Sequence, residues 1–428
     1  LHPGSLKPFG IPLSKQCSVR GLGHRDTTYE NSTIFAGYPA KRPWYGPAKW
    51  GVYQEAIPAG AEGYPYKLKA LWLACWTTPA AANGNAQKII EALADVNKIP
   101  LLFANDIVIG ESSMYADYIF PDVSYLEELQ TSKWPSSNMP HKANPLRQTT
   151  VAPIVDNCKV YGQEMPISVD AVKMAIAEKL GLPGYGPDGF GPGQNFTHYD
   201  QFYLKSAADI GVGDKPGDDV PDASDEEIEI FKKAHAHLPK SVYDYDRWRE
   251  AAGEQYWRKV VTIFNRGGRF QDFEKGYDGD KMGNKWAKMV NVYSEDCERT
   301  IHPGTGKRLP GIAEYRPVMD FFGNDLSAID EKAGYPYTFI TYKVVGGANF
   351  RGTAAYYWIR ETLPENYVVM HKEDAEKDGL KDGDMVKLSS VSNPEGMWDL
   401  KNGRKYPCGG KLKTTSGIRP GVVGVSYH

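Results

Sequence analysis

The sequence predicts an α/β fold in which a parallel-sheet unit is followed by a small β-rich domain. Two observations predict it. Within residues 70–128, apolar runs of strand length at 70–76 and 99–104 flank a helical segment, and 118–120 has the character of a third short strand. From about Tyr335 onward, short apolar or alternating runs are separated by glycine-containing turns, which is typical of a small β-barrel.

The helix of the parallel-sheet unit is predicted from its periodicity. After the polar turn Asn83–Asn85, one helical face collects Ile89, Ile90, Leu93 and Val96. Apolar strands separated by an amphipathic helix imply parallel pairing with both faces of the sheet covered. Ligands bind such sheets beyond the carboxyl ends of the strands, so we expect the binding residues among the polar side chains there.

The middle of the chain is predicted to contain several helices. A helix is expected between the N-cap Ser168 and Gly181, with one apolar face made of Val169, Val172, Ile176 and Leu180. Residues 183–193 are expected to form a glycine- and proline-rich loop.

Two further helices are expected after that loop. The acidic stretch 218–229 is interpreted as the solvated first turn of a helix, and residues 248–264 as a mostly helical segment that ends at Arg266–Phe270. His235 and His237 are interpreted as surface residues.

The C-terminal part is predicted in more detail. Strands are expected at 367–370, 385–389, 411–415 and 422–425. A short helix is expected at 372–377.

Composition excludes several classes of protein. The 428 residues exceed the size of a single core, and a net charge of −3 gives no electrostatic case for a nucleic-acid or membrane-surface partner. No apolar run is long enough to span a membrane. The five cysteines form no Cys-x-x-Cys pair that would hold zinc or an iron–sulfur cluster, and they are interpreted as buried structural thiols: Cys17, Cys75, Cys158, Cys297 and Cys408.

The chain is divided into four regions. We expect an irregular aromatic and proline-rich lead-in at 1–65, an α/β domain at 66–150, a second α/β and helical region at 151–334, and a truncated barrel at 335–428. Because it starts without methionine and ends in a β-rich segment, the chain is interpreted as a piece of a longer polypeptide.

Polar clusters after the first two strands are the first candidate site. Thr77, Thr78, Asn83 and Asn85 follow the first strand. The second strand is followed by Asn105, Asp106, Glu111, Ser112 and Ser113. Hydroxyls, amides and backbone donors near a helix start suit phosphate and sugar oxygens, and a carboxylate can accept two hydrogen bonds from a guanine edge or a ribose diol. Ordinary capping and turn chemistry is the alternative, and no G-x-G-x-x-G or Walker sequence occurs.

Three basic groups are weaker candidates. A glycine-rich loop brings Lys343 together with Asn349, Arg351 and Thr353, which could cradle an anion or a heteroaromatic edge. Arg147 and Gln148 follow a proline-rich loop, and Arg266 and Arg269 could bind an oxyanion bidentately. A surface loop, a loop salt bridge and a solvent-facing helix end are the respective alternatives.

Four segments, taken in order, resemble the catalytic subunits of the molybdopterin oxidoreductase (dimethyl-sulfoxide-reductase) superfamily. The segments are the strand–helix–strand unit up to Asn105-Asp106, the run Glu111-Ser-Ser-Met-Tyr-Ala-Asp-Tyr-Ile-Phe-Pro-Asp-Val-Ser-Tyr-Leu-Glu127, the pair Arg147-Gln148, and the stretch from Thr341-Tyr-Lys343 through Arg351-Gly-Thr353 to Asp384. Within the superfamily, residues 52–58 with 62–66, 264–270 and 311–315 are most similar to the tetrathionate reductase branch and its arsenate reductase relatives.

The resemblance implies Rossmann-like parallel-sheet domains followed by a partial, double-psi-like β-barrel. It implies molybdenum or tungsten held by two molybdopterin guanine dinucleotides, with a [4Fe-4S] cluster in a missing N-terminal part. The nucleotide would be contacted by Thr78, Asn105, Asp106, Ser112 and Ser113, and the pterin or phosphate by Lys343, Asn349, Arg351 and Thr353, with Arg147 and Gln148 as further cofactor contacts. No metal ligand is expected in the chain, because the residue that ligates the metal would lie upstream of Leu1.

The implied function is reduction of a sulfur oxyanion such as tetrathionate in anaerobic respiration. The implied partners are a ferredoxin-like iron–sulfur subunit together with a membrane-anchor subunit, with the enzyme in the periplasm or on the extracytoplasmic face of the membrane. Reduction of arsenate, polysulfide or thiosulfate is the nearer alternative. A cofactor-free scaffold subunit of a respiratory complex is the alternative from another class.

Overall fold

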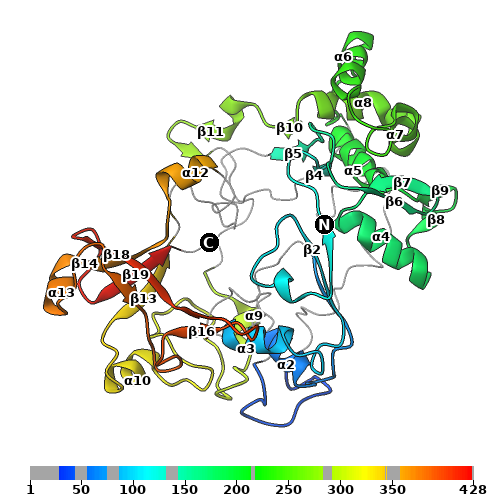
Figure 1. Ribbon diagram of the computed structural model, residues 1–428. Helices are drawn as coiled ribbons and strands as arrows, with labels where there is room; N and C mark the ends of the chain where they lie inside the picture. Colours follow the sequence, from blue (N-terminus) through cyan, green and yellow to red (C-terminus); the bar gives the residue numbers. More distant parts are fainter. Residues whose placement is uncertain are drawn as a thin grey trace.

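A computed structural model describes residues 28–43, 55–74, 86–131, 143–213, 217–282, 292–342, 344 and 357–426. Three parts position the candidate site (Figure 1): an α/β unit (residues 55–131), a helical unit (residues 199–270) and a C-terminal unit (residues 338–426). No helix in these residues is long and apolar enough to cross a membrane.

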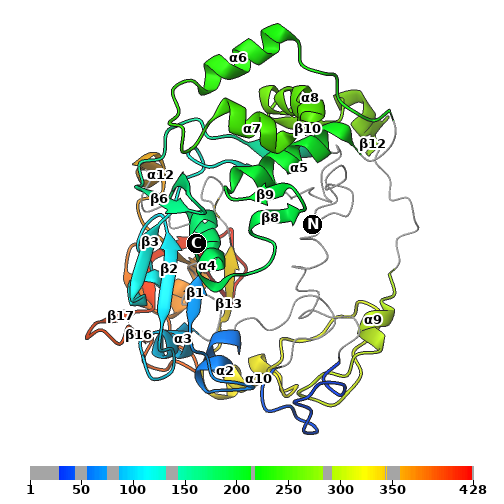
Figure 2. The ribbon, with the colours of Figure 1, turned by 90° about the vertical axis from the view of Figure 1, so that its right-hand side faces the viewer.

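The α/β unit is a three-stranded parallel sheet with one helix packed on it (Figure 2). Its elements are α2 (Ala56–Ala61), β1 (Leu71–Leu73), α3 (Ala86–Leu93), β2 (Leu102–Asp106), the 3₁₀ turn η3 (Ser113–Tyr115) and β3 (Tyr118–Pro121). The predicted order and parallel pairing are confirmed. The predicted helical face is wrong at Val96, which lies beyond the end of α3 and is exposed, because the helix stops at Leu93.

The side chains along β1 and β2 point alternately to the two faces of this sheet. Leu73, Leu102 and Ala104 pack against α3 in one apolar core. The side chains on the other face include Trp72 and Phe103, whose rings stack with centroids 5.7 Å apart. Because Asn105 lies two residues after Phe103, its side chain belongs to this aromatic face.

Small antiparallel ribbons lead from the α/β unit to the helices. They are β4 (Gln130–Thr131), β5 (Ala143–Arg147), β6 (Asn157–Val160), β7 (Gln163–Pro166), β8 (Gly186–Gly191) and β9 (Gln194–Phe196). The segment 183–193 was expected to be a loop, and this prediction is wrong because it supplies the first strand of the β8–β9 hairpin, whose Phe190 and Phe196 rings stack.

Helix α4 (Val169–Leu180) has the predicted ends, with the Ser168 side chain accepting from the Ala171 amide and Gly181 left-handed at φ 63°. Its predicted apolar face is buried at Val172 but differs from the buried face at Leu180. Ala171, Val172, Met174 and Ala177 are buried, whereas Leu180 is 67% exposed, because the small alanines allow the helix to approach the β6–β9 ribbons closely.

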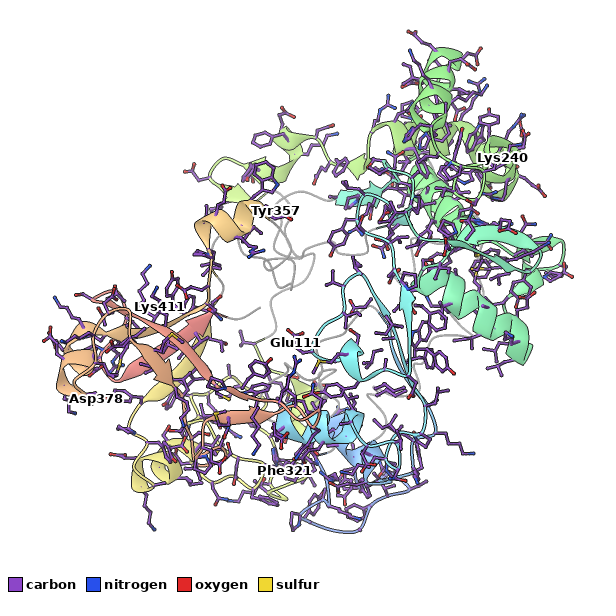
Figure 3. The ribbon with its side chains drawn as sticks, viewed as in Figure 1. Glu111, Lys240, Phe321, Tyr357, Asp378 and Lys411 are labelled. Atoms are coloured by element: carbon purple, nitrogen blue, oxygen red, sulfur yellow. The ribbon has the colours of Figure 1, made fainter. Side chains whose placement is uncertain are left out.

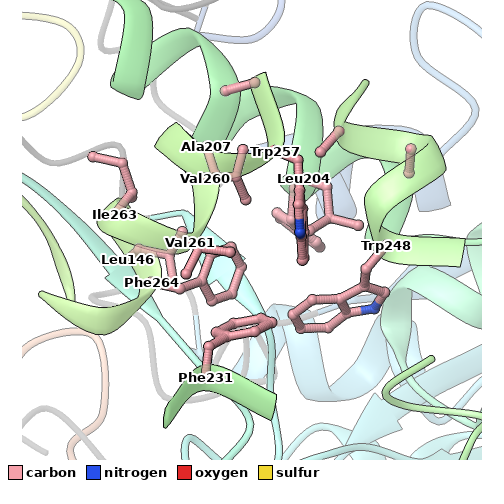
Figure 4. Close-up of a cluster of buried hydrophobic side chains, with 14 of the residues drawn as sticks. Leu146, Leu204, Ala207, Phe231, Trp248, Trp257, Val260, Val261, Ile263 and Phe264 are labelled. Atoms are coloured by element: carbon pink, nitrogen blue, oxygen red, sulfur yellow. The ribbon is translucent and has the colours of Figure 1, made fainter. Parts of the chain in front are cut away.

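The helical unit consists of α5 (Asp200–Val212), α6 (Asp225–His235), α7 (Tyr245–Ala252), α8 (Glu254–Asn265) and β10 (Gly268–Phe270). The mostly helical segment predicted over 248–264 is confirmed, as two helices that are separated at Gly253, which has φ 83° and ends α7. Figure 4 shows the core of this unit, where Phe231 lies against Trp248, Trp257 and Phe264.

One sequence interpretation of the helical unit is wrong, and another is confirmed. His235 is 5% exposed and stacks on Tyr243 in the aromatic core, so it is not a surface residue. The acidic stretch 218–229 leads into α6 as predicted, with exposed carboxylates in the first turn of the helix, and five of its carboxylates also pair with basic side chains of α8, its C-cap and β10. These pairs are Asp218–Arg269, Asp219–Lys259, Asp222–Lys259, Asp225–Arg258 and Glu227–Arg266.

The segment that follows contains short elements with few regular contacts. They are η4 (Phe273–Gly276), β11 (Tyr277–Asp278), β12 (Lys281–Met282), α9 (Glu295–Glu298) and α10 (Leu326–Lys332). Within residues 151–334, the described strands pair only in antiparallel fashion.

The C-terminal unit is an open, mixed five-stranded sheet in the order β13-β19-β14-β18-β15. Its elements are β13 (Thr338–Tyr342), α12 (Tyr357–Thr362), β14 (Tyr367–His371), α13 (Lys372–Lys377), β15 (Met385–Lys387), β16 (Met397–Asp399), β17 (Lys405–Pro407), β18 (Gly409–Thr415) and β19 (Val422–Ser426). The predicted strands and helix are confirmed, but the described strands close no barrel. The edge strand β13 is mostly exposed, and among the described strands it pairs with β19 alone.

Candidate functional site

The candidate site lies at the carboxyl end of β2, where we name Asn105, Asp106, Ser112 and Ser113 the strand-end cluster. Parallel pairing of β2 with β1 and β3 brings this end beside the carboxyl ends of both neighbouring strands. Figure 3 labels Glu111 on the loop before η3, near the middle of the view. The structure therefore assembles these four predicted residues in one place.

Asn105 is the residue of the cluster with an open hydrogen-bonding group. Its side chain is 1% exposed, and its Oδ1 accepts a 2.9 Å hydrogen bond from Trp72 Nε1. Its Nδ2 is buried and has no hydrogen-bond partner among the described residues. A buried amide donor without a partner costs about 1–3 kcal/mol, so such a group calls for a ligand or another explanation.

Asp106 is held by its own loop. Its Oδ1 accepts from the Ile107 amide at 3.0 Å, and its Oδ2 accepts from the Ser113 hydroxyl at 2.5 Å. Each carboxylate oxygen can accept more than one hydrogen bond, so these contacts are compatible with a further donor from a ligand. The carboxylate is therefore oriented before any ligand binds.

Ser113 has a supporting role in this geometry. Its hydroxyl donates to Asp106 and accepts from the Gly110 amide at 2.9 Å. Because the single hydroxyl hydrogen is used, Ser113 has no donor left for a phosphate oxygen. Ser112 is fully buried just before η3, and its backbone carbonyl accepts from the Tyr115 amide.

Carboxylates dominate the electrostatics near the cluster. Asp122 follows β3 as Asp106 ends β2, and its Oδ1 accepts from the amides of Val123 and Val169. Burial raises the pKa of Asp122 despite these two bonds, and the charges of Asp170 and Asp106 add to the rise. An acidic environment favours a ligand edge that donates hydrogen bonds and disfavours a phosphate at this point.

Arg147 and Gln148 are placed at the junction with the helical unit. Arg147, at the end of β5, forms an ion pair with Glu128 and lies over the Tyr125 ring at 4.2 Å. Burial still raises the pKa of Glu128, although Arg147 opposes that rise. Gln148 donates through Nε2 to the Phe264 carbonyl at 2.7 Å, so its amide faces α8 rather than the strand-end cluster.

Arg266 and Arg269 do not form an open oxyanion site. Arg266 pairs with Glu227 and donates to the Thr262 carbonyl. Arg269 pairs with Asp218 and donates to the Ile210 carbonyl. Both guanidinium groups therefore hold the helical unit together.

Five predicted cofactor contacts lie outside the described residues and stay predictions: Thr78, Lys343, Asn349, Arg351 and Thr353. No group of His, Cys, Asp and Glu in the described ranges could hold a metal ion. The described cysteines, Cys158, Cys297 and Cys408, are half-buried and form no disulfide.

Sequence reasoning missed two features of the site. Asp122 could have been found, because it directly follows the third predicted strand, where the strand-end rule applies equally. The bond between Trp72 and Asn105 spans 33 residues and carries no local signal.

Comparison with known proteins identifies the family. No family model matches the chain. The chain is 40% identical to a selenate reductase subunit of Mesobacillus selenatarsenatis over 100% of its own length and 39% of that protein. It is 29% identical to a tetrathionate reductase subunit of Salmonella typhimurium, over 99% of this chain and 39% of that protein.

Two further matches are more distant. The molybdopterin-containing thiosulfate reductase subunit of Salmonella typhimurium is 29% identical over 89% of this chain and 40% of that protein. Among solved structures, acetylene hydratase from Pelobacter acetylenicus matches with a TM-score of 0.39 and 13% identity, over 91% of this chain and 42% of that chain. The sequence prediction is confirmed: the chain belongs to the molybdopterin oxidoreductase superfamily, and it spans 39% of the length of the selenate and tetrathionate reductase subunits that it matches.

Proposed function

We propose that the chain is the part of a molybdenum- or tungsten-dependent reductase that holds the guanine end of a molybdopterin guanine dinucleotide. The observation that carries this proposal is the match to reductase subunits along the whole chain. The full enzyme is proposed to contain two such dinucleotides. Its fold is proposed to consist of Rossmann-like domains and a double-psi-like barrel, and the C-terminal unit would be part of that barrel.

The strand-end cluster has donors and acceptors that complement a guanine edge. Guanine presents N1–H and N2–H₂ donors beside the O6 and N7 acceptors. Asp106 would accept from the donors, since each of its oxygens can accept more than one hydrogen bond. Asn105 Nδ2 would donate to an acceptor, which removes the cost of leaving that buried amide without a partner among the described residues. In a scaffold subunit that binds no cofactor, such a buried amide would carry its energetic cost without a ligand to offset it.

The same charges separate the base from the phosphates. Asp106 and Asp122 would repel a pyrophosphate placed beside them. We therefore propose that the phosphates lie away from these two carboxylates, and that they are contacted by Lys343, Arg351 and Thr353. When bound, the cofactor supplies the two-electron redox chemistry. The residues of this chain orient its nucleotide and exclude water from it.

The substrate is proposed to be an oxyanion of a group-16 element. Tetrathionate remains a candidate, and selenate becomes a stronger one because the selenate reductase relative shares 40% identity against 29% for the tetrathionate reductase relative. Reduction of selenate consumes two electrons and two protons and releases selenite and water. Reduction of tetrathionate consumes two electrons and releases two thiosulfate ions.

The partners are proposed from the same family membership. The selenate and tetrathionate reductase relatives are each named as one subunit, which implies further subunits in those enzymes. For this protein we propose a ferredoxin-like iron–sulfur subunit together with a membrane-anchor subunit. We further propose an extracytoplasmic location, which reporter fusions to the native polypeptide would test.

The experiment is purification of the native polypeptide that contains these residues, followed by metal analysis and acid hydrolysis. We expect molybdenum or tungsten, and about two GMP released per metal ion, since two dinucleotides are proposed. Reduced viologen would then be supplied with selenate, tetrathionate, thiosulfate or arsenate in parallel, and the highest kcat/KM identifies the substrate. A protein that holds neither metal nor GMP contradicts the proposal.

The 428 residues alone provide the matched control. We expect them to retain no molybdenum and to reduce none of these oxyanions, because no described group of side chains could hold the metal. Turnover by this chain with stoichiometric molybdenum would overturn that expectation.

A further inference from the structure

One hairpin of the C-terminal unit reaches across to the α/β unit. Strands β16 and β17 form this hairpin (residues 397–407), and both views show it beside α3 (Figures 1 and 2). Its contacts fall on two short elements of the α/β unit. The first is the start of α3, which follows β1, and the second is η3, which follows the strand-end loop.

The contact with α3 resembles the pairing of two strands. Gln87 Nε2 donates to the Asp399 carbonyl at 3.1 Å, and Gln87 Oε1 accepts from the Asp399 amide at 3.1 Å. One side-chain amide thus satisfies both backbone groups of a residue 312 positions away. Lys401 lies 3.5 Å from Glu91, one turn further along α3, and adds a partly exposed ion pair.

The contact with η3 is a hydrogen bond. The Tyr115 hydroxyl donates to the Leu400 carbonyl at 2.8 Å. Tyr115 belongs to the same 3₁₀ turn as Ser113, whose hydroxyl orients Asp106. The hairpin therefore contacts the elements that follow both β1 and β2.

We infer that the β16–β17 hairpin sets the spacing of α3 and η3, with Gln87 and Tyr115 as positioning residues for the strand-end cluster. This inference rests on the proposed function only where it names the ligand, a guanine nucleotide that the strand-end cluster would bind. Because the hairpin is part of the C-terminal unit, the same contacts fix where that unit sits relative to Asp106. Freeing the hairpin is expected to loosen the loop that carries the strand-end cluster.

Hydrogen exchange of the 428-residue chain tests this coupling without a ligand. Gln87→Leu removes both bonds to Asp399, and Tyr115→Phe removes the bond to Leu400. Exchange at the Asp399 amide is expected to rise about tenfold in Gln87→Leu. It is expected to rise less in Gln87→Glu, because a carboxylate oxygen still accepts from that amide.

The deciding readout is the Gly110 amide, which donates to Ser113 Oγ in the strand-end loop. We expect its exchange to rise several-fold in both Gln87→Leu and Tyr115→Phe. Gln163→Leu and Tyr66→Phe, two exposed positions away from the hairpin, are matched controls that leave it unchanged. Faster exchange at Asp399 with an unchanged Gly110 amide would show a purely local contact and overturn the inference.

Guanosine diphosphate, added to the same variants, separates this inference from the proposed function. Gln87→Leu is expected to weaken its binding several-fold, whereas Asp106→Ala abolishes binding and leaves Asp399 exchange unchanged. Binding that is equally tight in Gln87→Leu and in the parent chain contradicts the positioning role. A parent chain that binds no guanosine diphosphate contradicts the proposed nucleotide site, while the Gly110 exchange still decides the inference.

Discussion

The helical unit and the C-terminal unit differ in the size of the hydrophobic core that stabilises each of them. The helical unit is built on a large core of aromatic and aliphatic side chains around Phe231, and its surface carboxylates are matched by basic partners. Among the described residues, the core of the C-terminal unit has five buried side chains, Val368, Met370, Ala375, Leu412 and Val423. Its edge strand β13 exposes Phe339 and Ile340.

This difference indicates that the two units are stabilised in different ways. Burial of large aromatic side chains is strongly stabilising, and the helical unit contains many of them in one core, which Leu129 and Leu146 of the preceding segment complete. The C-terminal unit depends on contacts to its neighbours, including the β16–β17 hairpin on α3. The α/β unit lies between them and has a buried polar group that nothing in the described part of the chain satisfies.

The largest effect is expected from the core of the helical unit. Phe231→Ala removes a fully buried ring and is expected to lower the free energy of unfolding by about 3–5 kcal/mol. Urea denaturation followed by far-UV circular dichroism measures this loss. The adjacent Ile230→Ala is the control, since Ile230 is 56% exposed and should cost well under about 1 kcal/mol. Equal losses in the two variants would contradict a core centred on Phe231.

A large but local effect is expected in the C-terminal unit. Leu412→Ala creates a cavity in its small core and is expected to cost about 2–5 kcal/mol. Because that core is separate, hydrogen exchange should rise in residues 367–426 and stay unchanged in α5–α8. Uniformly faster exchange throughout the chain would show that the two units unfold together.

A moderate, pH-dependent effect is expected from His235. Burial lowers the pKa of His235, so the folded protein binds this proton more weakly than the unfolded chain does. Stability is therefore complete above about pH 6.5 and falls as the pH drops toward the lower folded pKa, by at most about 1.4 kcal/mol per pH unit. Urea titrations at pH 7.5 and 5.5 measure the slope.

His235→Phe is expected to flatten this slope, since phenylalanine does not titrate and suits the neighbouring rings of Phe231 and Tyr243. His237→Gln, at an exposed position, serves as the control and should keep the parent slope. A His235→Phe variant with the parent slope would place the pH dependence elsewhere.

The smallest effect is expected from the charges on the helical unit. Lys259 lies 2.7 Å from Asp219 and 3.1 Å from Asp222, and its side chain is mostly buried. Lys259→Gln is expected to cost about 1 kcal/mol, less in high salt. Lys232→Gln, which breaks a more exposed pair with Glu229, should cost less than Lys259→Gln does. Thermal unfolding at low and high salt compares the two.

Local patterns predicted the elements well where the signal was short-range. The parallel β1–β2–β3 order, the caps of α4, and the strands of the C-terminal unit all followed from periodicity and turn residues. Predictions about faces were less successful. Leu180 of α4 is exposed and His235 of α6 is buried, because the neighbours that cover a helix are set by distant segments.

Part of the candidate site could be predicted in the same way. The strand-end rule places Asn105 and Asp106 at the carboxyl end of β2, whatever the rest of the chain does. Other features of the site depend on residues that lie tens to hundreds of positions apart in the sequence. They are the Asn105 amide without a partner among the described residues, the acidic surroundings of Asp106, and the hydrogen bonds between Gln87 and Asp399. Sequence spacing carries no information about such contacts.

The sequence by itself determined the α/β class, the parallel unit with its polar strand ends, and the superfamily, because periodicity and motif order are properties of the chain. Only the tertiary structure decided that the Asn105 amide has no partner among the described residues, that Ser113 supports Asp106 instead of reaching outward, and that Arg266 and Arg269 are occupied. The physical reason is that a hydrogen-bonding group is open or satisfied according to its neighbours in space, and folding chooses those neighbours.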